Sequence, residues 1–332
     1  MRFGLALPHY DFSLPGGQPI TTAAALEWAR RAEALGFDEL WISDHLFYSF
    51  GRYGADPAPI ASLEATTTLA AVATVTERVR LGTLVLCDAF RHAGLLAKQA
   101  ATLDQLSGGR LDLGLGAGWL GAEFEAFGLS FGTVGERFTA LEETVEVLAR
   151  ILDDPSPFTY EGTTVSFHDA PRSPDVVQRP IPIWLGGKGG PRLLRLAARH
   201  AAGWNTVWRV DPGRYATQVD EVRAACEGVG RDPATFRLSV GLYGVTGETD
   251  DEARAAFERA RAAFPGDAMR DDTWERWRAD TLSGDGPALL ERVAAFEALG
   301  VEQIVLSPWS LPFAVPEPEQ VERFAAALGL GG

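Results

Sequence analysis

The chain is poor in cysteine and has no long basic or apolar run. Cys87 and Cys226 are its two cysteines, and they lack the spacing of a metal site or a disulfide framework. No Lys/Arg-rich run offsets the net charge of −15, which argues against nucleic acid or an anionic membrane surface as a partner. No apolar stretch is long enough to cross a membrane, and because a strand-like segment begins at once we expect no signal peptide. We therefore expect a cytoplasmic protein without a metal site.

What the chain has in quantity is apolar side chains and turn-forming residues. Hydrophobic residues make up 46% of the sequence, and the 36 glycines and 20 prolines are spread along it. This composition supplies a large core and many short loops. A length of 332 residues is normal for one α/β barrel with insertions, and no shift in composition marks a second domain. We therefore expect residues 1–332 to form a single domain.

Short apolar segments alternate with helical patterns along the chain. The strand-like segments are 3–8, 39–43, 79–85, 111–116, 182–185, 204–207, 238–243 and 303–306. This alternation predicts an α/β fold, a (β/α)8 TIM barrel with insertions at its C-terminal face. A doubly wound sheet is the rival fold, although it would not usually need so many units. Residues 158–167 predict a hairpin, and the segment with Trp274 and Trp277 predicts a loop that covers a substrate or packs on the barrel rim.

Asp44 and His45 follow the second strand, at the end where TIM barrels carry their active sites. An acid beside an imidazole can orient a substrate oxygen or move a proton, and an unperturbed imidazole titrates near physiological pH. A structural role is the alternative, in which Asp44 caps a loop and His45 packs against its neighbours. His9, at the end of the first strand, can also face the barrel mouth. The residues alone leave these roles open.

Two further strand ends carry small residues. The run 82–87 ends the third strand and is by itself compatible with an ordinary buried strand. The run 114–119 ends the fourth strand. It is no Rossmann fingerprint, because the third glycine of that motif is missing and because the motif follows the first strand of its fold and not the fourth. Its glycines allow the backbone to approach a flat ligand closely. Trp119 then stands at the rim, either in the site or as a packing aromatic residue.

A glycine-rich loop, 186–190, follows the fifth strand, and a helix begins at Pro191. The free N–H groups of a helix start favour anions, and Lys188 and Arg192 add positive charge. This arrangement predicts a phosphate site. A second basic cluster follows the third strand and either meets a polyanionic ligand or forms a solvated surface: Arg91, His92 and Lys98.

The order and the sequences of these segments resemble those of the bacterial-luciferase-like superfamily and, within it, of the enzymes that use the deazaflavin coenzyme F420. The resemblance is strongest over 37–45, 79–119 and 177–205. It implies that His45 lies beside the isoalloxazine ring and that Asp44 lies near the coenzyme. It also implies a bulge with a non-prolyl cis peptide at Leu84–Val85, which supports the ring from behind.

The resemblance also bears on the coenzyme and the substrate. It identifies 186–190 as the coenzyme loop, and the absence of the serine common in FMN-using relatives favours F420 over FMN. Cys87 stands where many relatives carry a hydroxyl residue, so its role is open. Trp119 stands where the sugar-phosphate dehydrogenases of this superfamily carry an acid, which argues against that particular chemistry.

The function that the resemblance implies is hydride transfer between C5 of F420 and a small organic substrate. The catalytic candidates are His45 as proton donor or acceptor, Asp44 orienting His45 or the coenzyme, and Trp119. The coenzyme-binding candidates are Leu84, Val85, Cys87, Gly116, Ala117, Gly118, Gly186, Gly187, Lys188 and Gly189. An FMN-dependent monooxygenase served by a separate flavin reductase is the alternative, and a flavin-binding relative without catalysis is the second. A homodimer is also open.

Overall fold

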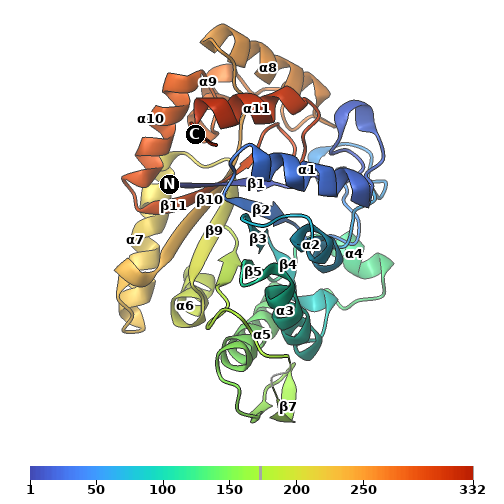
Figure 1. The fold of residues 1–332 in the computed structure, drawn as a ribbon, viewed down its shortest axis with the longest axis vertical. Helices are drawn as coiled ribbons and strands as arrows, with labels where there is room; N and C mark the ends of the chain where they lie inside the picture. The colour runs from blue at the N-terminus through green and yellow to red at the C-terminus, as the bar shows by residue number, and fades with distance from the viewer. Residues whose placement is uncertain (172–173, 332) are drawn as a thin grey trace.

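Parallel strands close into a barrel at the centre of the structure (Figure 1). The structure is a computed structural model that describes residues 1–171 and 174–331. In sheet order its strands are β3 Arg80–Thr83, β2 Glu39–Ile42, β1 Arg2–Ala6, β11 Val301–Ser307, β10 Arg237–Tyr243, β9 Gly203–Trp208, β8 Ile183–Gly186, β5 Leu111–Gly116 and β4 Leu86–Cys87. Both β3 and β4 pair with β5, which closes the barrel, and they share one of its eight positions. The predicted TIM barrel is confirmed.

Helices surround the barrel and cover its outer face (Figure 1). They are α1 Thr22–Ala34, α2 Ala65–Ala73, α3 Ala93–Ser107, α5 Val134–Asp153, α6 Pro191–His200, α7 Pro212–Gly228, α8 Asp250–Ala263, α10 Gly286–Glu297 and α11 Pro318–Ala327, with two short ones, α4 Gly121–Ala126 and α9 Trp274–Asp280. The hairpin predicted at 158–167 consists of β6 Phe158–Glu161 and β7 Ser166–Ala170.

Local sequence sets the ends of these elements. Thr133 and Glu136 form a capping box that begins α5, with each side chain accepting from the other residue's backbone N–H. Gly108 ends α3 with a φ of 65°, a left-handed conformation that glycine adopts without a steric penalty. Every residue of β5 is buried, as expected for a parallel strand covered on both faces. Helix caps, glycine ends and buried strands of this kind build the barrel, and the loops after its strands carry the site.

The structure differs from the sequence prediction at two of these loops. The strand expected over 79–85 is divided, since β3 ends at Thr83 and β4 begins at Leu86; the Leu84–Val85 bond between them is cis, as the resemblance implied. The loop expected around Trp274 and Trp277 contains the helix α9, and both indole side chains are buried. Periodicity missed α9 because seven residues give too little of a helical pattern.

Insertions gather at the C-terminal ends of the strands. The segment after β2 includes a short 3-10 helix at Gly51–Tyr53, and the segment after β5 carries α4. The segment after β10 carries α8 and α9. Among the described residues, no helix is both long and apolar enough to cross a membrane.

Candidate active site

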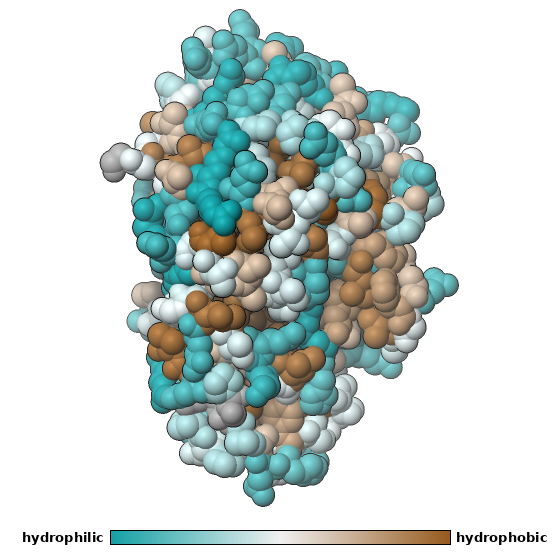
Figure 2. All heavy atoms as spheres, turned by 45° about the vertical axis from the view of Figure 1, so that its right-hand side comes forward, coloured by the Kyte–Doolittle hydropathy of each residue, from teal (hydrophilic) through white to brown (hydrophobic). Residues whose placement is uncertain are grey.

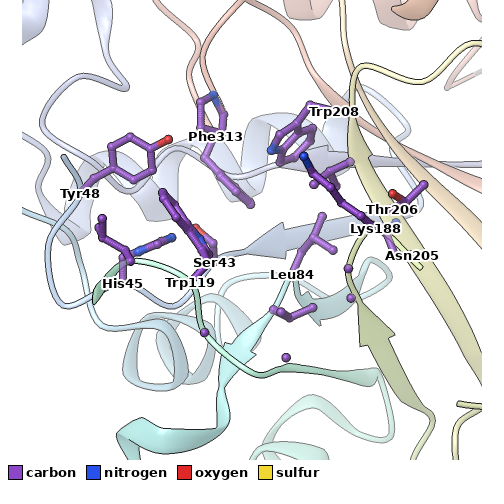
Figure 3. A pocket seen from close by; sticks show the side chains of 18 of the residues that line it. Ser43, His45, Tyr48, Leu84, Trp119, Lys188, Asn205, Thr206, Trp208 and Phe313 are labelled. Carbon is purple, nitrogen blue, oxygen red and sulfur yellow. The ribbon is translucent and has the colours of Figure 1, made fainter. Parts of the chain in front are cut away.

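A cavity of about 750 Å³ lies at the C-terminal ends of the barrel strands. All thirteen residues predicted for the site line it: Asp44, His45, Leu84, Val85, Cys87, Gly116, Ala117, Gly118, Trp119, Gly186, Gly187, Lys188 and Gly189. Figure 3 shows His45, Tyr48 and Trp119 on one side of this cavity and Lys188 and Asn205 on the other. The rules of strand order therefore bring together segments that lie far apart in the sequence.

His45 is held by a carboxylate from another loop. Its Nδ1 makes a short hydrogen bond to the Glu123 carboxylate on α4, and the second Glu123 oxygen accepts from the Leu46 backbone N–H at 3.2 Å. The side chain of Glu123 is 1% exposed. Because the carboxylate occupies Nδ1, the other ring nitrogen of His45, Nε2, is left for the cavity. This is the geometry of an oriented acid–base imidazole.

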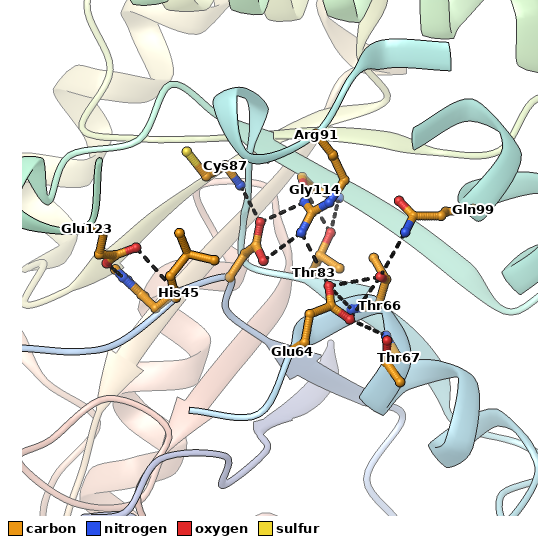
Figure 4. Close-up of polar contacts among 12 residues, drawn as sticks. His45, Glu64, Thr66, Thr67, Thr83, Cys87, Arg91, Gln99, Gly114 and Glu123 are labelled. Carbon is orange, nitrogen blue, oxygen red and sulfur yellow. Dashed lines mark hydrogen bonds and ion pairs between the residues drawn. The ribbon is translucent and has the colours of Figure 1, made fainter. Parts of the chain in front are cut away.

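The Asp44 carboxylate binds Arg91 and the Cys87 backbone and does not hold the His45 ring directly, in contrast to one of the roles predicted for it. The carboxylate accepts two hydrogen bonds from Arg91, at 2.7 and 2.9 Å, and one from the Cys87 backbone N–H at 2.9 Å (Figure 4). The Arg91 side chain is 8% exposed and also contacts Glu64, so it is neither a solvated residue nor a free phosphate contact. Asp44 thus joins the loop after β2 to β4 and fixes the wall behind the cavity.

The glycines near the cavity floor make room for protein side chains as well as for a ligand. A Cβ on Gly116 would lie 2.6 Å from Cγ2 of Val85, and one on Gly186 would lie 2.5 Å from its Cγ1. Gly118, with a φ of 70°, leaves space for the Cys87 sulfur. The bare strand ends therefore let Val85 project between β5 and β8 as an apolar platform. Burial raises the pKa of the Cys87 thiol to about 12, so it is a packed neutral group.

The loop 186–190 gives the opposite side of the cavity a positive character. Gly187, Gly189 and Gly190 all have positive φ, so side chains there would strain the backbone. Lys188 and Arg214 line the cavity, and the described residues provide no acidic partner for either side chain. Arg192, the other predicted cation, is instead paired with Glu142 on α5. The anion-binding capacity therefore rests on Lys188, Arg214 and the start of α6.

Aromatic rings form the upper wall of the cavity. Trp208 stacks on Tyr243, with ring centroids 5.3 Å apart, and Tyr243 stacks on Trp277. Phe313 meets the Trp208 ring edge-on at 5.3 Å. Trp119, which is 41% exposed, lies 5.5 Å from the His45 ring. Of the two roles open for the 274–277 segment, the structure shows packing on the rim, with Trp277 reaching the cavity.

His9 is excluded as a proton donor to the cavity by its hydrogen bonds. Its Nδ1–H donates to the Leu7 carbonyl at 2.8 Å, so its Nε2 must accept from the Ser43 hydroxyl at 3.0 Å. Ser43 in turn accepts from the Tyr10 hydroxyl at 2.5 Å. Burial lowers the pKa of His9 to about 3. This neutral chain is satisfied within the protein, which leaves His45 as the imidazole that faces the cavity.

Several residues of the site were not expected from the sequence. Glu123 gave a weak signal, since it is one of two acids, with Glu125, in a mostly apolar insertion after β5. Asn205, Trp208 and Phe313 gave none, because their positions depend on how β9 and the segment after β11 curve over the barrel. The Val207–Trp208 bond, at the end of β9, is a second non-prolyl cis peptide and was also not predicted.

Comparison with known proteins identifies the family of this chain. Residues 1–303 match the luciferase-like monooxygenase family. The chain is 35% identical over 200 residues to an F420-dependent glucose-6-phosphate dehydrogenase of Microbacterium testaceum, covering 58% of this chain and 55% of that protein. It thus spans little more than half the length of that curated relative.

Solved structures share the fold of nearly the whole chain. A monooxygenase from Streptomyces bottropensis superimposes with a TM-score of 0.77 at 27% identity, covering 99% of this chain and 98% of its own. An F420-dependent secondary alcohol dehydrogenase, solved with an F420–acetone adduct, superimposes with a TM-score of 0.79 at 19% identity and the same coverage. This chain belongs to the luciferase-like family, and its relatives are oxidoreductases and monooxygenases.

Proposed function

We propose that the protein is an F420-dependent oxidoreductase that transfers a hydride between the coenzyme and a small organic substrate. The observation that carries the proposal is the cavity itself, which joins an oriented imidazole, an apolar platform and an unpaired cationic loop. The dehydrogenase relative supports F420 at 35% identity. The serine-free loop 186–190 supports the same choice.

The residues present fit such a coenzyme. Val85 offers an apolar surface on which a ring can rest, and Lys188 and Arg214 offer charge for a phosphate. Asn205 lines the cavity, and its buried Oδ1 has no hydrogen-bond partner among the described residues, so a ligand N–H or O–H is the donor it lacks. When bound, F420 supplies the hydride carrier at its C5 position.

The protein's own part is to bind the coenzyme, orient the substrate and exchange a proton with it. The Lys188 side chain and the start of α6 would hold the anionic end of the coenzyme, and Val85 would support its ring. Nε2 of His45 gives a proton to, or takes one from, the substrate oxygen or nitrogen while Glu123 holds Nδ1. The aromatic wall excludes water from the reacting atoms. Asp44, committed to Arg91, keeps the loop that carries His45 in place.

The alternative is an FMN-dependent monooxygenase, which the likeness to the Streptomyces bottropensis monooxygenase supports. The experiment that separates the two is an anaerobic assay of the purified protein with F420 and a panel of alcohols, ketones, imines and activated alkenes. We expect coenzyme absorbance to change without oxygen. Turnover that requires oxygen and reduced FMN would overturn the F420 assignment in favour of the monooxygenase.

A further inference from the structure

Arg52 is a cation at the cavity mouth that the proposed coenzyme contacts do not use. It lies in the 3-10 helix after β2, on the His45 side of the cavity and on a different loop from Lys188. Its guanidinium carbon is 4.6 Å from the centre of the Trp119 ring and 5.2 Å from the centre of the Tyr53 ring. Stacking on both rings holds the side chain in place, and a guanidinium bound by its face keeps the N–H donors in its own plane available for a ligand.

The charge of Arg52 is not neutralised within the described residues, none of which forms an ion pair with it. Arg209, the other arginine on the aromatic side, shows the contrast, because Asp272 and Asp280 both bind it. The carboxylates that line the cavity are already committed, Asp44 to Arg91 and Glu123 to His45. The mouth of the cavity is therefore cationic in a chain whose net charge is −15.

The Arg52 charge acts into the cavity. Burial raises the pKa of the Tyr243 hydroxyl, and the positive charges of Arg209 and Arg52 oppose that rise. Between Arg52 and His45 lies the Trp119 indole, which contacts both. A molecule that reached from His45 to the guanidinium would therefore lie along the Trp119 indole.

The lining between these two points is aromatic. Tyr48 lies 5.4 Å from the His45 ring, Phe50 lies 5.1 Å from Tyr48, and Phe264 lies 5.7 Å from Tyr53. Figure 2 shows the face of the molecule on which α4 lies. Hydrophobic side chains are concentrated across the middle of this face, and hydrophilic side chains lie above and below them. Such a wall favours a ring-bearing, apolar body over a polyhydroxylated one, whose hydroxyls would lack partners.

We propose that the substrate is an organic anion with an aromatic or conjugated body, whose acidic group binds Arg52 while its reacting carbon lies at His45. The inference rests on the proposed function for the reacting end, but the anion site itself does not depend on which coenzyme is bound. Arg52 then determines specificity, and Trp119 holds both the substrate body and the guanidinium.

Two fluorescent probes with the same aryl body test this proposal. One is 8-anilinonaphthalene-1-sulfonate, which carries an anionic group, and the other is N-phenyl-1-naphthylamine, which is neutral. We expect Arg52→Gln to weaken binding of the sulfonate about tenfold at low salt, as expected for loss of one charge-assisted contact. Binding of the neutral probe should change less than about twofold, because it has no group for the guanidinium. Arg52→Lys should restore part of the sulfonate affinity.

Arg30→Gln is the matched control, since Arg30 is exposed on α1, outside the cavity. Equal loss of both probes in Arg52→Gln, or no loss of the sulfonate, would overturn the proposal. So would a sulfonate loss that follows Lys188→Ala instead, because the anion would then lie in the coenzyme loop. The measurement needs no coenzyme, so an Arg52-dependent sulfonate site in a protein that fails to bind F420 would overturn the proposed function alone.

Discussion

Glu123→Gln is the substitution that most directly probes the catalytic geometry. Glu123 is buried on α4, and its carboxylate binds Nδ1 of His45 and the Leu46 backbone N–H. Glutamine keeps the shape and can still accept one hydrogen bond, but it removes the negative charge from Nδ1 of His45. The imidazole then keeps an acceptor at Nδ1 but loses the negative charge that stabilises it when it carries a proton.

The magnitude follows from the kind of bond that is lost. A hydrogen bond to a charged group contributes about 1.5–3 kcal/mol. Since each 1.36 kcal/mol corresponds to about tenfold in rate, the hydride-transfer step should slow by roughly ten- to a hundredfold. Coenzyme affinity should change much less, because Lys188 lies across the cavity from His45, the residue that Glu123 holds (Figure 3).

The assay is single-turnover absorbance of the coenzyme after mixing with substrate, together with a coenzyme titration of the same variant. Glu125→Gln is the control, because Glu125 lies two positions along the same helix with an exposed side chain. Thermal unfolding checks that both variants fold. The reasoning is refuted if Glu123→Gln reacts at the wild-type rate, or if only its coenzyme affinity falls while the rate per bound coenzyme holds.

Three further predictions follow from the same structure. His45→Ala should slow single-turnover hydride transfer by at least about a hundredfold, the lower bound of general acid–base help, and a normal rate would make His45 a packing residue. Lys188→Ala should raise the coenzyme dissociation constant by about tenfold in calorimetric titration, less at high salt, whereas no change at low salt would place the phosphate elsewhere. Glu39 should make folding stability depend on pH, because burial raises its pKa from 4.5 to about 8, with Asp112 adding to the rise and Arg2 opposing it. The folded protein binds this proton more tightly than the unfolded chain, so the free energy of unfolding should fall as pH rises from 4.5 to about 8. Denaturant unfolding of Glu39→Gln should lose that slope, and an unchanged slope would contradict the assignment.

The barrel and the position of the site were predictable because they depend on local pattern. Alternating strand and helix signals give a TIM barrel, and parallel strands bring their C-terminal ends to one face. That rule alone brings His45, Gly116 and Lys188 to one cavity.

The partners of these residues were less predictable, because they depend on how the insertions fold. Glu123 reaches His45 from 78 residues away, through a helix of six residues whose placement no periodicity reveals. Asp44 binds Arg91 instead of its sequence neighbour for a similar reason, since the loop after β4 turns back toward β2. The stack of Arg52 on Trp119 joins two insertions, and the sequence of either insertion alone does not indicate it.

The measurement that tests the central claim most directly is a titration of the purified protein with F420 and with FMN under the same conditions. The cationic loop 186–190, the Val85 platform and the Asn205 oxygen, which has no hydrogen-bond partner among the described residues, predict binding of a flavin-type coenzyme. The absence of serine from that loop predicts a lower dissociation constant for F420 than for FMN. Equal or tighter binding of FMN, or no binding of F420, would contradict the account.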